Sequence, residues 1–224
     1  MPLSSIVERL RRSQAEGPAG PFRVLLLCTG NLCRSRIAES LLAHRLGAVV
    51  DAGSLIVESA GTRPASGVSQ PGAVREEIER LGGAIDDAPP RGLDDVVLAQ
   101  VDLVLTMTRG QRTAAVRRAP RLVRRAFTLP EYAHLVASLA ERPPAQWHPG
   151  GGDAEVLRRM TEAAARRRGA VAPSPDAAAI EIADPFGGER PGYRDAADRI
   201  DGEVALLAET FVKLRGRNTG RTVR

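Results

Sequence analysis

The sequence predicts an α/β fold, a three-layer sandwich whose centre is a four-stranded parallel sheet. Short apolar runs of strand length alternate along the chain with longer segments whose apolar residues recur at helical spacing. The first run, from Arg23 to Cys28, is unbroken after its first residue, which is typical of a strand buried on both faces of a parallel sheet. Strands that alternate with helices pair in parallel through right-handed crossovers, so helices are expected on both faces.

The first half of the chain contains two of the four expected strands. After the strand at 23–28, a Thr-Gly-Asn sequence breaks the apolar run, and a helical pattern from Ile37 to His44 follows. A second strand is expected at 55–59. The amphipathic segment 73–81 ends at a pair of glycines, which are common just after the last turn of a helix, so we expect a helix there.

The other two strands are expected between residues 100 and 130. A short helix at 94–99 precedes the third strand, at 101–107, and a helix at 110–118 follows it and ends before a proline. The fourth strand is short, at 126–129, and leads into a helix at 131–140. These segments complete the predicted sheet.

The composition changes between residue 141 and about residue 180, where prolines, glycines, alanines and arginines predominate. A helix is expected within this stretch at 153–168, but the stretch as a whole indicates an insertion or a flexible excursion rather than part of the sheet. A last amphipathic helix is expected at about 194–214.

These patterns divide the chain into a flexible N-terminal extension at 1–21, one domain at 22–213 and a basic tail at 214–224. The formal net charge is +5, and residues 1–211 sum to zero, so the excess positive charge comes from residues 212–224. A basic terminus of this kind is more often a solvated end than a binding site for phosphate groups.

The composition also excludes several classes of protein. With 43% hydrophobic residues among 224, the chain can build a packed core. Two cysteines cannot form a disulfide framework, which predicts a reducing compartment. No apolar run approaches the roughly 18 residues of a membrane helix, and the N-terminus has no secretory signal. We therefore expect a cytoplasmic protein without a membrane span.

The segment from Cys28 to Ser35 joins the first strand to the start of a helix, where unpaired N–H groups attract anions. A glycine allows the segment to curve tightly, and Asn31 tolerates the left-handed backbone that such curvature often needs. Arg34 can then present its two-pronged guanidinium to a phosphate group. Because donors that hold a phosphate also stabilise a thiolate, Cys28 is the candidate nucleophile.

This strand, its Cys-x-Gly-Asn-x-Cys-Arg-Ser loop and the helix after it together resemble the low-molecular-weight protein tyrosine phosphatase family. The resemblance spans about residues 22–140 and 180–213, and it implies the phosphatase-I-like form of the α/β sandwich. Three further segments carry it, namely Ser59-Ala-Gly-Thr62, Phe127-Thr-Leu129 and Ile182-Ala-Asp-Pro-Phe-Gly-Gly188.

The resemblance implies hydrolysis of protein phosphotyrosine in two steps, without a metal or another cofactor. Cys28 would attack phosphorus and become a phosphocysteine, while Arg34 and loop amides stabilise the phosphoryl oxygens. Asp184 would protonate the leaving oxygen and later deprotonate the attacking water. From the residues alone, Asp184 could equally be a turn or N-cap residue. The other expected members of the phosphate-binding loop are Thr29, Gly30, Asn31, Leu32, Cys33 and Ser35.

Four further side chains have expected roles. Leu32 and Phe186 are expected to form apolar walls of the substrate pocket, although Phe186 could instead pack on the last helix. Cys33 could form a reversible disulfide with Cys28 under oxidation, or it could be a small buried filler. Arg36 stands where the family usually has proline. We expect this change to weaken the preorganisation of the helix start modestly and to place an arginine on the surface, where it could attract acidic substrates.

Two other functions compete with a tyrosine phosphatase. Protein arginine phosphatases of the same fold are similar at Thr29 and at Asp-Pro-Phe-Gly-Gly, whereas Leu32 in place of their threonine favours phosphotyrosine. A non-catalytic phospho-binding or nucleic-acid-binding module is the alternative from another class, because seven arginines lie between Arg109 and Arg125. Aromatic residues are only 3% of the chain, so nucleic acid is a less expected partner. The three histidines are scattered, and no metal site is expected.

Overall fold

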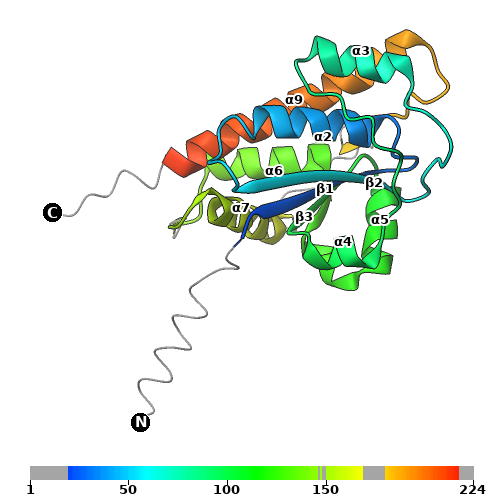
Figure 1. Ribbon diagram of the computed structural model, residues 1–224. Helices are drawn as coiled ribbons and strands as arrows, with labels where there is room; N and C mark the ends of the chain where they lie inside the picture. The colour runs from blue at the N-terminus through cyan, green and yellow to red at the C-terminus, as the bar shows by residue number, and fades with distance from the viewer. Residues whose placement is uncertain (1–19, 146, 148–149, 169–179, 217–224) are drawn as a thin grey trace.

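A parallel sheet of four strands forms the centre of the molecule (Figure 1). The computed structural model describes residues 20–145, 147, 150–168 and 180–216. The strand order is β2-β1-β3-β4, and every neighbouring pair is parallel, as the sequence predicts. The strands are β1 (Phe22–Cys28), β2 (Leu55–Gly61), β3 (Leu103–Thr106) and β4 (Ala126–Thr128).

The register of the sheet places three strand ends at one edge. Cys28 at the end of β1 pairs with Gly61 at the end of β2, and the neighbouring Leu27 pairs with Thr106 at the end of β3. Loops that leave the carboxyl ends of parallel strands meet at such an edge, which is where α/β proteins commonly bind ligands. The loop after Cys28 is therefore flanked by the segments that follow β2 and β3.

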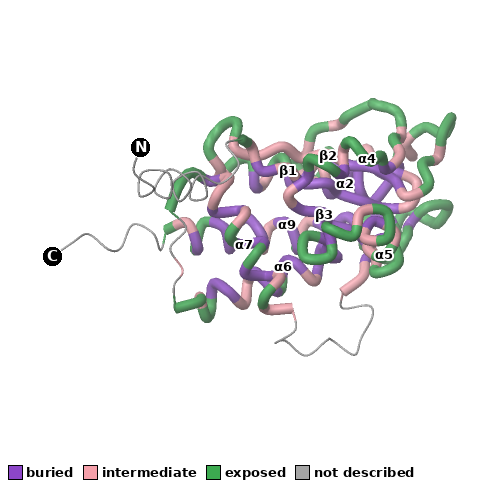
Figure 2. The backbone as a smooth tube through the Cα atoms, turned by 90° about the horizontal axis from the view of Figure 1, so that it is seen from below, coloured by how far each residue is buried: buried purple, intermediate pink, exposed green. Residues whose placement is uncertain are grey.

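Helices cover both faces of the sheet, and an α/β/α sandwich results. The alternating side chains of β1 divide between two cores, because successive residues of a strand point to opposite faces. Val24 and Leu26 pack in the larger core with α2, α6, α7 and α9, whereas Leu25 and Leu27 pack in the smaller core with α4, α5 and the 3₁₀ helix η1. Figure 2 shows the buried strands between helices whose outer sides are exposed. The helices are α2 (Arg34–Arg45), α3 (Gly72–Arg80), α4 (Asp95–Gln100), α5 (Arg109–Arg118), η1 (Pro120–Arg124), α6 (Leu129–Glu141), α7 (Asp153–Arg167) and α9 (Arg190–Gly216).

Helix α2 begins three residues before the apolar periodicity that predicts it. Its first turn consists of Arg34, Ser35 and Arg36, whose polar side chains carry no apolar pattern, but all three are buried. Polar residues at the start of a helix are invisible to an argument from hydrophobic periodicity. This turn is where the loop after Cys28 ends.

The helix expected at 153–168 is present as α7, and it belongs to the packed core. Val156, Leu157 and Met160 are buried against the same core as β1, although the sequence led us to expect an insertion or flexible excursion around them. Helix α9 is longer than expected and continues to Gly216. Leu214 is fully buried, and its carbonyl accepts a hydrogen bond of 3.3 Å from the Trp147 indole.

Helix α9 therefore includes the first three residues of the expected basic tail, so this boundary is corrected to Gly216. Most of the predicted N-terminal extension, the rest of the tail and residues 169–179 lie outside the described residues. In the described ranges, no helix is both long and apolar enough to cross a membrane.

Candidate active site

Cys28 lies at the end of β1, with its side chain buried under the loop of residues 28–35. Two donors converge on its sulfur. The backbone N–H of Asn31 donates to Cys28 Sγ over 3.2 Å, and the hydroxyl of Ser35 lies 3.0 Å from the same atom. A sulfur that accepts hydrogen bonds from an amide and a hydroxyl is stabilised in its anionic form.

The 28–35 loop has a curved shape because of the backbone conformation of Asn31 and the hydrogen bonds from the segment after β2. Asn31 has a φ of 58°, and it is the sole non-glycine residue with positive φ among the described residues, so the left-handed conformation expected there is present. The end of β2 at Gly61 passes so close to the loop that a Cβ there would lie 2.5 Å from the backbone carbonyl oxygen of Thr29. The N–H groups of Thr62, Arg63 and Ala65 donate to the carbonyls of residues 28, 29 and 30.

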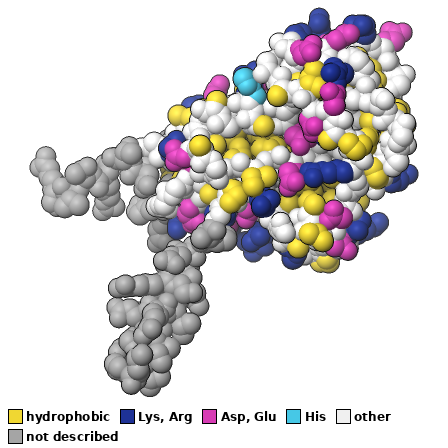
Figure 3. Space-filling view, viewed as in Figure 1, with side chains coloured by type: hydrophobic (Ala, Val, Ile, Leu, Met, Phe, Trp, Pro, Cys, Tyr) yellow, Lys and Arg dark blue, Asp and Glu magenta, His cyan; other side chains and the backbone are white. Residues whose placement is uncertain are grey.

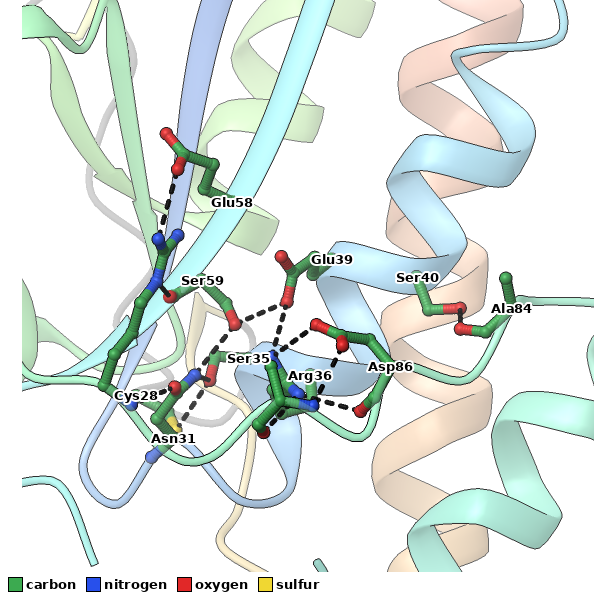
Figure 4. Close-up of polar contacts among 12 residues, drawn as sticks. Cys28, Asn31, Ser35, Arg36, Glu39, Ser40, Glu58, Ser59, Ala84 and Asp86 are labelled. Carbon is green, nitrogen blue, oxygen red and sulfur yellow. Dashed lines mark hydrogen bonds and ion pairs between the residues drawn. The ribbon is translucent and has the colours of Figure 1, made fainter. Parts of the chain in front are cut away.

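The Asn31 side chain connects the loop to two serines (Figure 4). Its Nδ2 donates to Ser35 Oγ over 3.1 Å and to Ser59 Oγ over 2.8 Å, and its Oδ1 accepts from the backbone N–H of Arg91 over 2.9 Å. Because Ser35 accepts a hydrogen from Asn31, its own hydroxyl hydrogen is available for the Cys28 sulfur. The network thus orients a donor toward the candidate nucleophile.

Arg34 is 3% exposed, and two of its three side-chain nitrogens donate hydrogen bonds. Its Nη1 donates to the Ile182 carbonyl over 3.0 Å, and its Nη2 donates to the carboxylate of Asp184. Nε has no hydrogen-bond partner in the part of the chain that the structure describes. A buried cation with a free donor is costly unless an anion completes its hydrogen bonds. The geometry therefore fits an oxyanion beside Arg34.

A cavity of about 840 Å³ opens beside Arg34. The segment of residues 181–184 closes one side of it, and the N-terminal end of α5 closes the other. Ile182 donates its N–H to the Met107 carbonyl over 2.9 Å, and Glu181 accepts from the N–H of Arg109 over 2.9 Å. These contacts bring a segment from the end of the sequence across the carboxyl edge of the sheet.

Asp184 is 48% exposed and lies at the rim of this cavity. One carboxylate oxygen pairs with Arg34, and the other accepts the N–H of Phe186 over 3.2 Å, a turn contact of the kind expected for an Asp before proline. The sequence suggested either a turn residue or a group that acts on the substrate. Asp184 has contacts of both kinds, because it makes a local turn and also pairs with the buried arginine. A carboxyl group at this position can exchange protons with a ligand held by Arg34.

Gln111 is a site residue that the sequence analysis missed. Its Nε2 donates to Thr29 Oγ1 over 3.2 Å, while its Oε1 accepts the N–H groups of Met107 and Thr108. With Thr108 it forms the capping box of α5, so one side chain fixes both the helix start and the 28–35 loop. The signal was present in the sequence as a Thr-x-x-Gln pattern at 108–111.

Leu32 and Phe186 do not line this cavity. Leu32 is 3% exposed and faces a neighbouring cavity of about 420 Å³ that Asn31 and Arg36 also line. Phe186 is 55% exposed and lies two residues beyond Asp184. The structure therefore groups Cys28, Arg34 and Asp184 around one loop. Arg34 and Asp184 line the cavity, whereas Cys28 and the two expected apolar walls are not among its lining residues.

Cys33 is buried at the start of α2 and is a free thiol. Its pKa is raised to about 12, mainly by burial, and further by the charges of Cys28 and Asp184, while Arg34 acts in the opposite direction. The thiol is therefore protonated at neutral pH, and it packs in the large core. In the described ranges, no three side chains of the metal-ligating kinds gather into a group that could hold a metal ion.

Solved structures of known function share this fold. The YwlE arginine phosphatase from Geobacillus stearothermophilus superposes with a TM-score of 0.59 and 24% identity, over 91% of this chain and 99% of that chain. The low molecular weight protein tyrosine phosphatase from T. tengcongensis superposes with a TM-score of 0.58 and 23% identity, over 84% and 98%.

Sequence comparison identifies the family. A protein-arginine-phosphatase of Geobacillus stearothermophilus is 26% identical over 84% of this chain and 95% of that protein. The low molecular weight protein-tyrosine-phosphatase Ptp of Acinetobacter johnsonii is 34% identical over 40% of this chain and 58% of that protein. The family model for low molecular weight phosphotyrosine protein phosphatases matches residues 23–142, more than half of the chain. The chain therefore belongs to the low molecular weight phosphotyrosine protein phosphatase family and is a phosphoric monoester hydrolase.

Proposed function

We propose that this phosphatase hydrolyses phosphotyrosine in proteins through a phosphocysteine on Cys28. The observation that carries the proposal is the buried guanidinium of Arg34, whose Nε has no partner among the described residues. Arg34 belongs to the loop whose donors converge on the Cys28 sulfur. A phosphate group supplies the oxygens that this arginine lacks. The Cys28 sulfur, which contacts the Asn31 N–H and the Ser35 hydroxyl of the same loop, is then the nucleophile.

In the first step, Cys28 Sγ attacks phosphorus, an S–P bond forms, and the bond from phosphorus to the leaving oxygen breaks. Arg34 and the loop amides stabilise the charge on the equatorial oxygens. A bound phosphate takes over the Arg34 donor that Asp184 occupies in the free protein. The released carboxylate takes up a proton from solvent and gives it to the leaving oxygen as the bond to phosphorus breaks.

In the second step, water attacks the phosphocysteine while Asp184 accepts its proton. The S–P bond breaks, and the sulfur leaves as a thiolate stabilised by the Ser35 hydroxyl and the Asn31 N–H. Both steps require a reduced Cys28, which is consistent with our proposal of a cytoplasmic location. The mechanism uses the chain's own residues and no cofactor.

Phosphotyrosine is supported by Phe186, an exposed aromatic ring that follows Asp184 closely and could pack on a phenol leaving group. Leu32 does not support this choice of substrate, because its side chain faces a different cavity. Phosphoarginine is the second candidate. The carboxylates of Glu181 and Asp184 both line the cavity and could accept hydrogen bonds from a guanidinium, and a curated relative of similar length is a protein-arginine-phosphatase.

A pure binding module is less well supported. On the face shown in Figure 3, acidic and basic side chains are interspersed, whereas a nucleic-acid-binding surface is expected to carry a continuous basic patch. Hydrolysis distinguishes the two classes, because a binding module has no turnover.

The experiment that tests the proposal compares kcat/KM on one peptide that carries phosphotyrosine and on a matched peptide that carries phosphoarginine. Cys28→Ser is the control, and it should abolish turnover of both substrates. We expect the phosphotyrosine peptide to be the better substrate. A preference for phosphoarginine would overturn the tyrosine assignment, and turnover that survives in Cys28→Ser would overturn the mechanism.

A further inference from the structure

Arg36 is a charged residue in the first turn of α2, and its side chain is only 7% exposed. This corrects the expectation that it lies on the surface, where it would attract acidic substrates. A buried guanidinium must find acceptors for its N–H groups, because an unpaired charge in the interior is strongly destabilising. The partners of Arg36 therefore show what the side chain does.

Arg36 binds the coil that follows α3. Its Nη2 donates to the backbone carbonyls of Asp86 and Ala88, over 2.8 Å and 2.9 Å. Its Nη1 lies 3.1 Å from the carboxylate of Asp86 and 3.4 Å from that of Glu39. One side chain thus fastens residues 86–88, which have no regular secondary structure, to the first turn of α2 (Figure 4).

The fastened coil leads directly to the 28–35 loop. Three residues after Ala88, the N–H of Arg91 donates to Asn31 Oδ1 over 2.9 Å, and the Arg91 Nε donates to the Ser59 carbonyl over 2.5 Å. The orientation of the Asn31 amide therefore depends on where the coil holds residue 91. That amide gives its hydrogens to Ser35 and Ser59.

Arg36 reaches the same amide by a second route, through Glu39. The Ser59 hydroxyl donates to Glu39 Oε2 over 2.6 Å, so its oxygen is left to accept from Asn31. Burial raises the pKa of Glu39. The hydrogen bond from Ser59 opposes that rise, as do the positive charges of Arg36 and Arg91, whereas the negative charge of Asp86 adds to it. Arg36 thereby favours the ionised carboxylate that the hydrogen-bond directions require.

We propose that Arg36 is a positioning residue for the nucleophile: it holds the 86–88 coil and the Glu39 carboxylate, and through both it fixes the Asn31 amide that directs the Ser35 hydroxyl toward the Cys28 sulfur. The inference rests on the proposed function, because it assigns a purpose to the orientation of the Cys28 donors.

The test compares Arg36→Met with Arg158→Met as a matched control. Arg158, on α7, also donates to two backbone carbonyls, those of Gly20 and Pro21, and pairs with Asp102. These contacts lie just before the start of β1, whereas Cys28 ends that strand. We expect Arg36→Met to lower kcat on para-nitrophenyl phosphate about tenfold with little change in KM, as misplaced catalytic groups do. Arg158→Met should lose similar thermal stability and keep the kcat of the wild type.

The pH profile separates positioning from simple destabilisation. Without the positive charge of Arg36, Glu39 becomes protonated at a higher pH, so the acidic limb of the kcat profile of Arg36→Met should move toward neutral pH. In the double variant with Glu39→Gln that movement should disappear. Arg36→Lys keeps the charge, so the acidic limb of its kcat–pH profile should stay at the wild-type pH. Its kcat should still fall, because one ammonium cannot hold two carbonyls and a carboxylate together.

Hydrogen–deuterium exchange provides a readout that does not need turnover. Amide exchange in residues 29–33 and 86–91 should accelerate in Arg36→Met and remain at the wild-type rate in Arg158→Met. Unchanged exchange and unchanged kcat in Arg36→Met would overturn the inference. A wild type without hydrolytic activity would overturn the proposed function, and the exchange result would still decide whether Arg36 fixes the loop.

Discussion

Replacing Asp184 with asparagine separates two effects of this carboxylate, its ion pair with Arg34 and its proton transfer to the leaving group. Asparagine keeps the shape and the turn contact to Phe186 but loses the charge and the acidic proton. In the free protein the carboxylate occupies one donor of Arg34, so phosphate must displace it before that arginine can bind the phosphate fully. The same substitution should therefore strengthen anion binding and weaken catalysis.

The size of each effect follows from the structure. Asp184 is about half exposed, so its pair with Arg34 is screened by solvent and contributes about 0.5–1 kcal/mol. Removing that competition should tighten the binding of inorganic phosphate by a factor of about two to five. Loss of general acid catalysis costs about 10²–10⁴ in rate for a poor leaving group and much less for an activated aryl phosphate.

The assay measures phosphate affinity by calorimetry, and kcat/KM, which reports the first chemical step, on a phosphotyrosine peptide and on para-nitrophenyl phosphate. Asp198→Asn is the control, because Asp198 is also about half exposed and paired with an arginine, Arg80, on the surface of another helix pair. It should change none of the three quantities. Equal losses on the two substrates would refute the proton-donor role, and unchanged phosphate affinity would refute the competition for Arg34.

Three further predictions concern the 28–35 loop and its surroundings. Arg34→Lys should lower kcat/KM about 10²-fold, because a single ammonium cannot make the bidentate contact; near-normal rates would contradict the loop geometry. Gly61→Ala should lower stability by about 1–3 kcal/mol and reduce activity, because the new Cβ meets a loop carbonyl at 2.5 Å, whereas Gly72→Ala, which meets no atom within 4 Å, should be neutral; equal melting temperatures of the two variants would contradict this. Cys33 should resist alkylation at neutral pH. Burial raises the pKa of this thiol from 9.0 to about 12, so the unfolded chain loses the proton at a lower pH than the folded protein does. The contribution of Cys33 to the free energy of unfolding should therefore fall as the pH rises from 9 toward 12, and Cys33→Ala should make that fall smaller.

The fold was accessible from sequence because its signals are local. The unbroken apolar run of β1 and the helix-ending glycines after α3 are each formed by residues that are close together in the sequence. The alternation of strands with helices is a series of such short patterns. Asn31 belongs to the same class, because its tolerance of positive φ is a property of the residue itself. Helix α7 was found, but its place in the core depends on contacts with β1 and α6 that no local pattern contains.

The surroundings of the site were much less accessible, because they depend on contacts across long sequence separations. Arg36 was expected on the surface since charged residues usually lie there, and only the coil at 86–88 explains its burial. Leu32 was expected to face the substrate because it belongs to the loop, but the curvature of that loop turns it toward another cavity. Gly61 was visible as part of a motif, while the reason for it, the approach of Thr29, appears only in three dimensions.

The most direct test of the account is to find the phosphoryl group on the enzyme during turnover. With para-nitrophenyl phosphate, whose leaving group needs little protonation, Asp184→Asn should slow mainly the second step, in which the carboxylate activates water, so rapid quenching at acidic pH should trap the intermediate. Mass spectrometry of the digested protein should then place the phosphoryl group on Cys28, with none on Cys33 and none in Cys28→Ala. Continued hydrolysis with no phosphorylated cysteine, or a phosphoryl group on a different residue, would contradict the central claim.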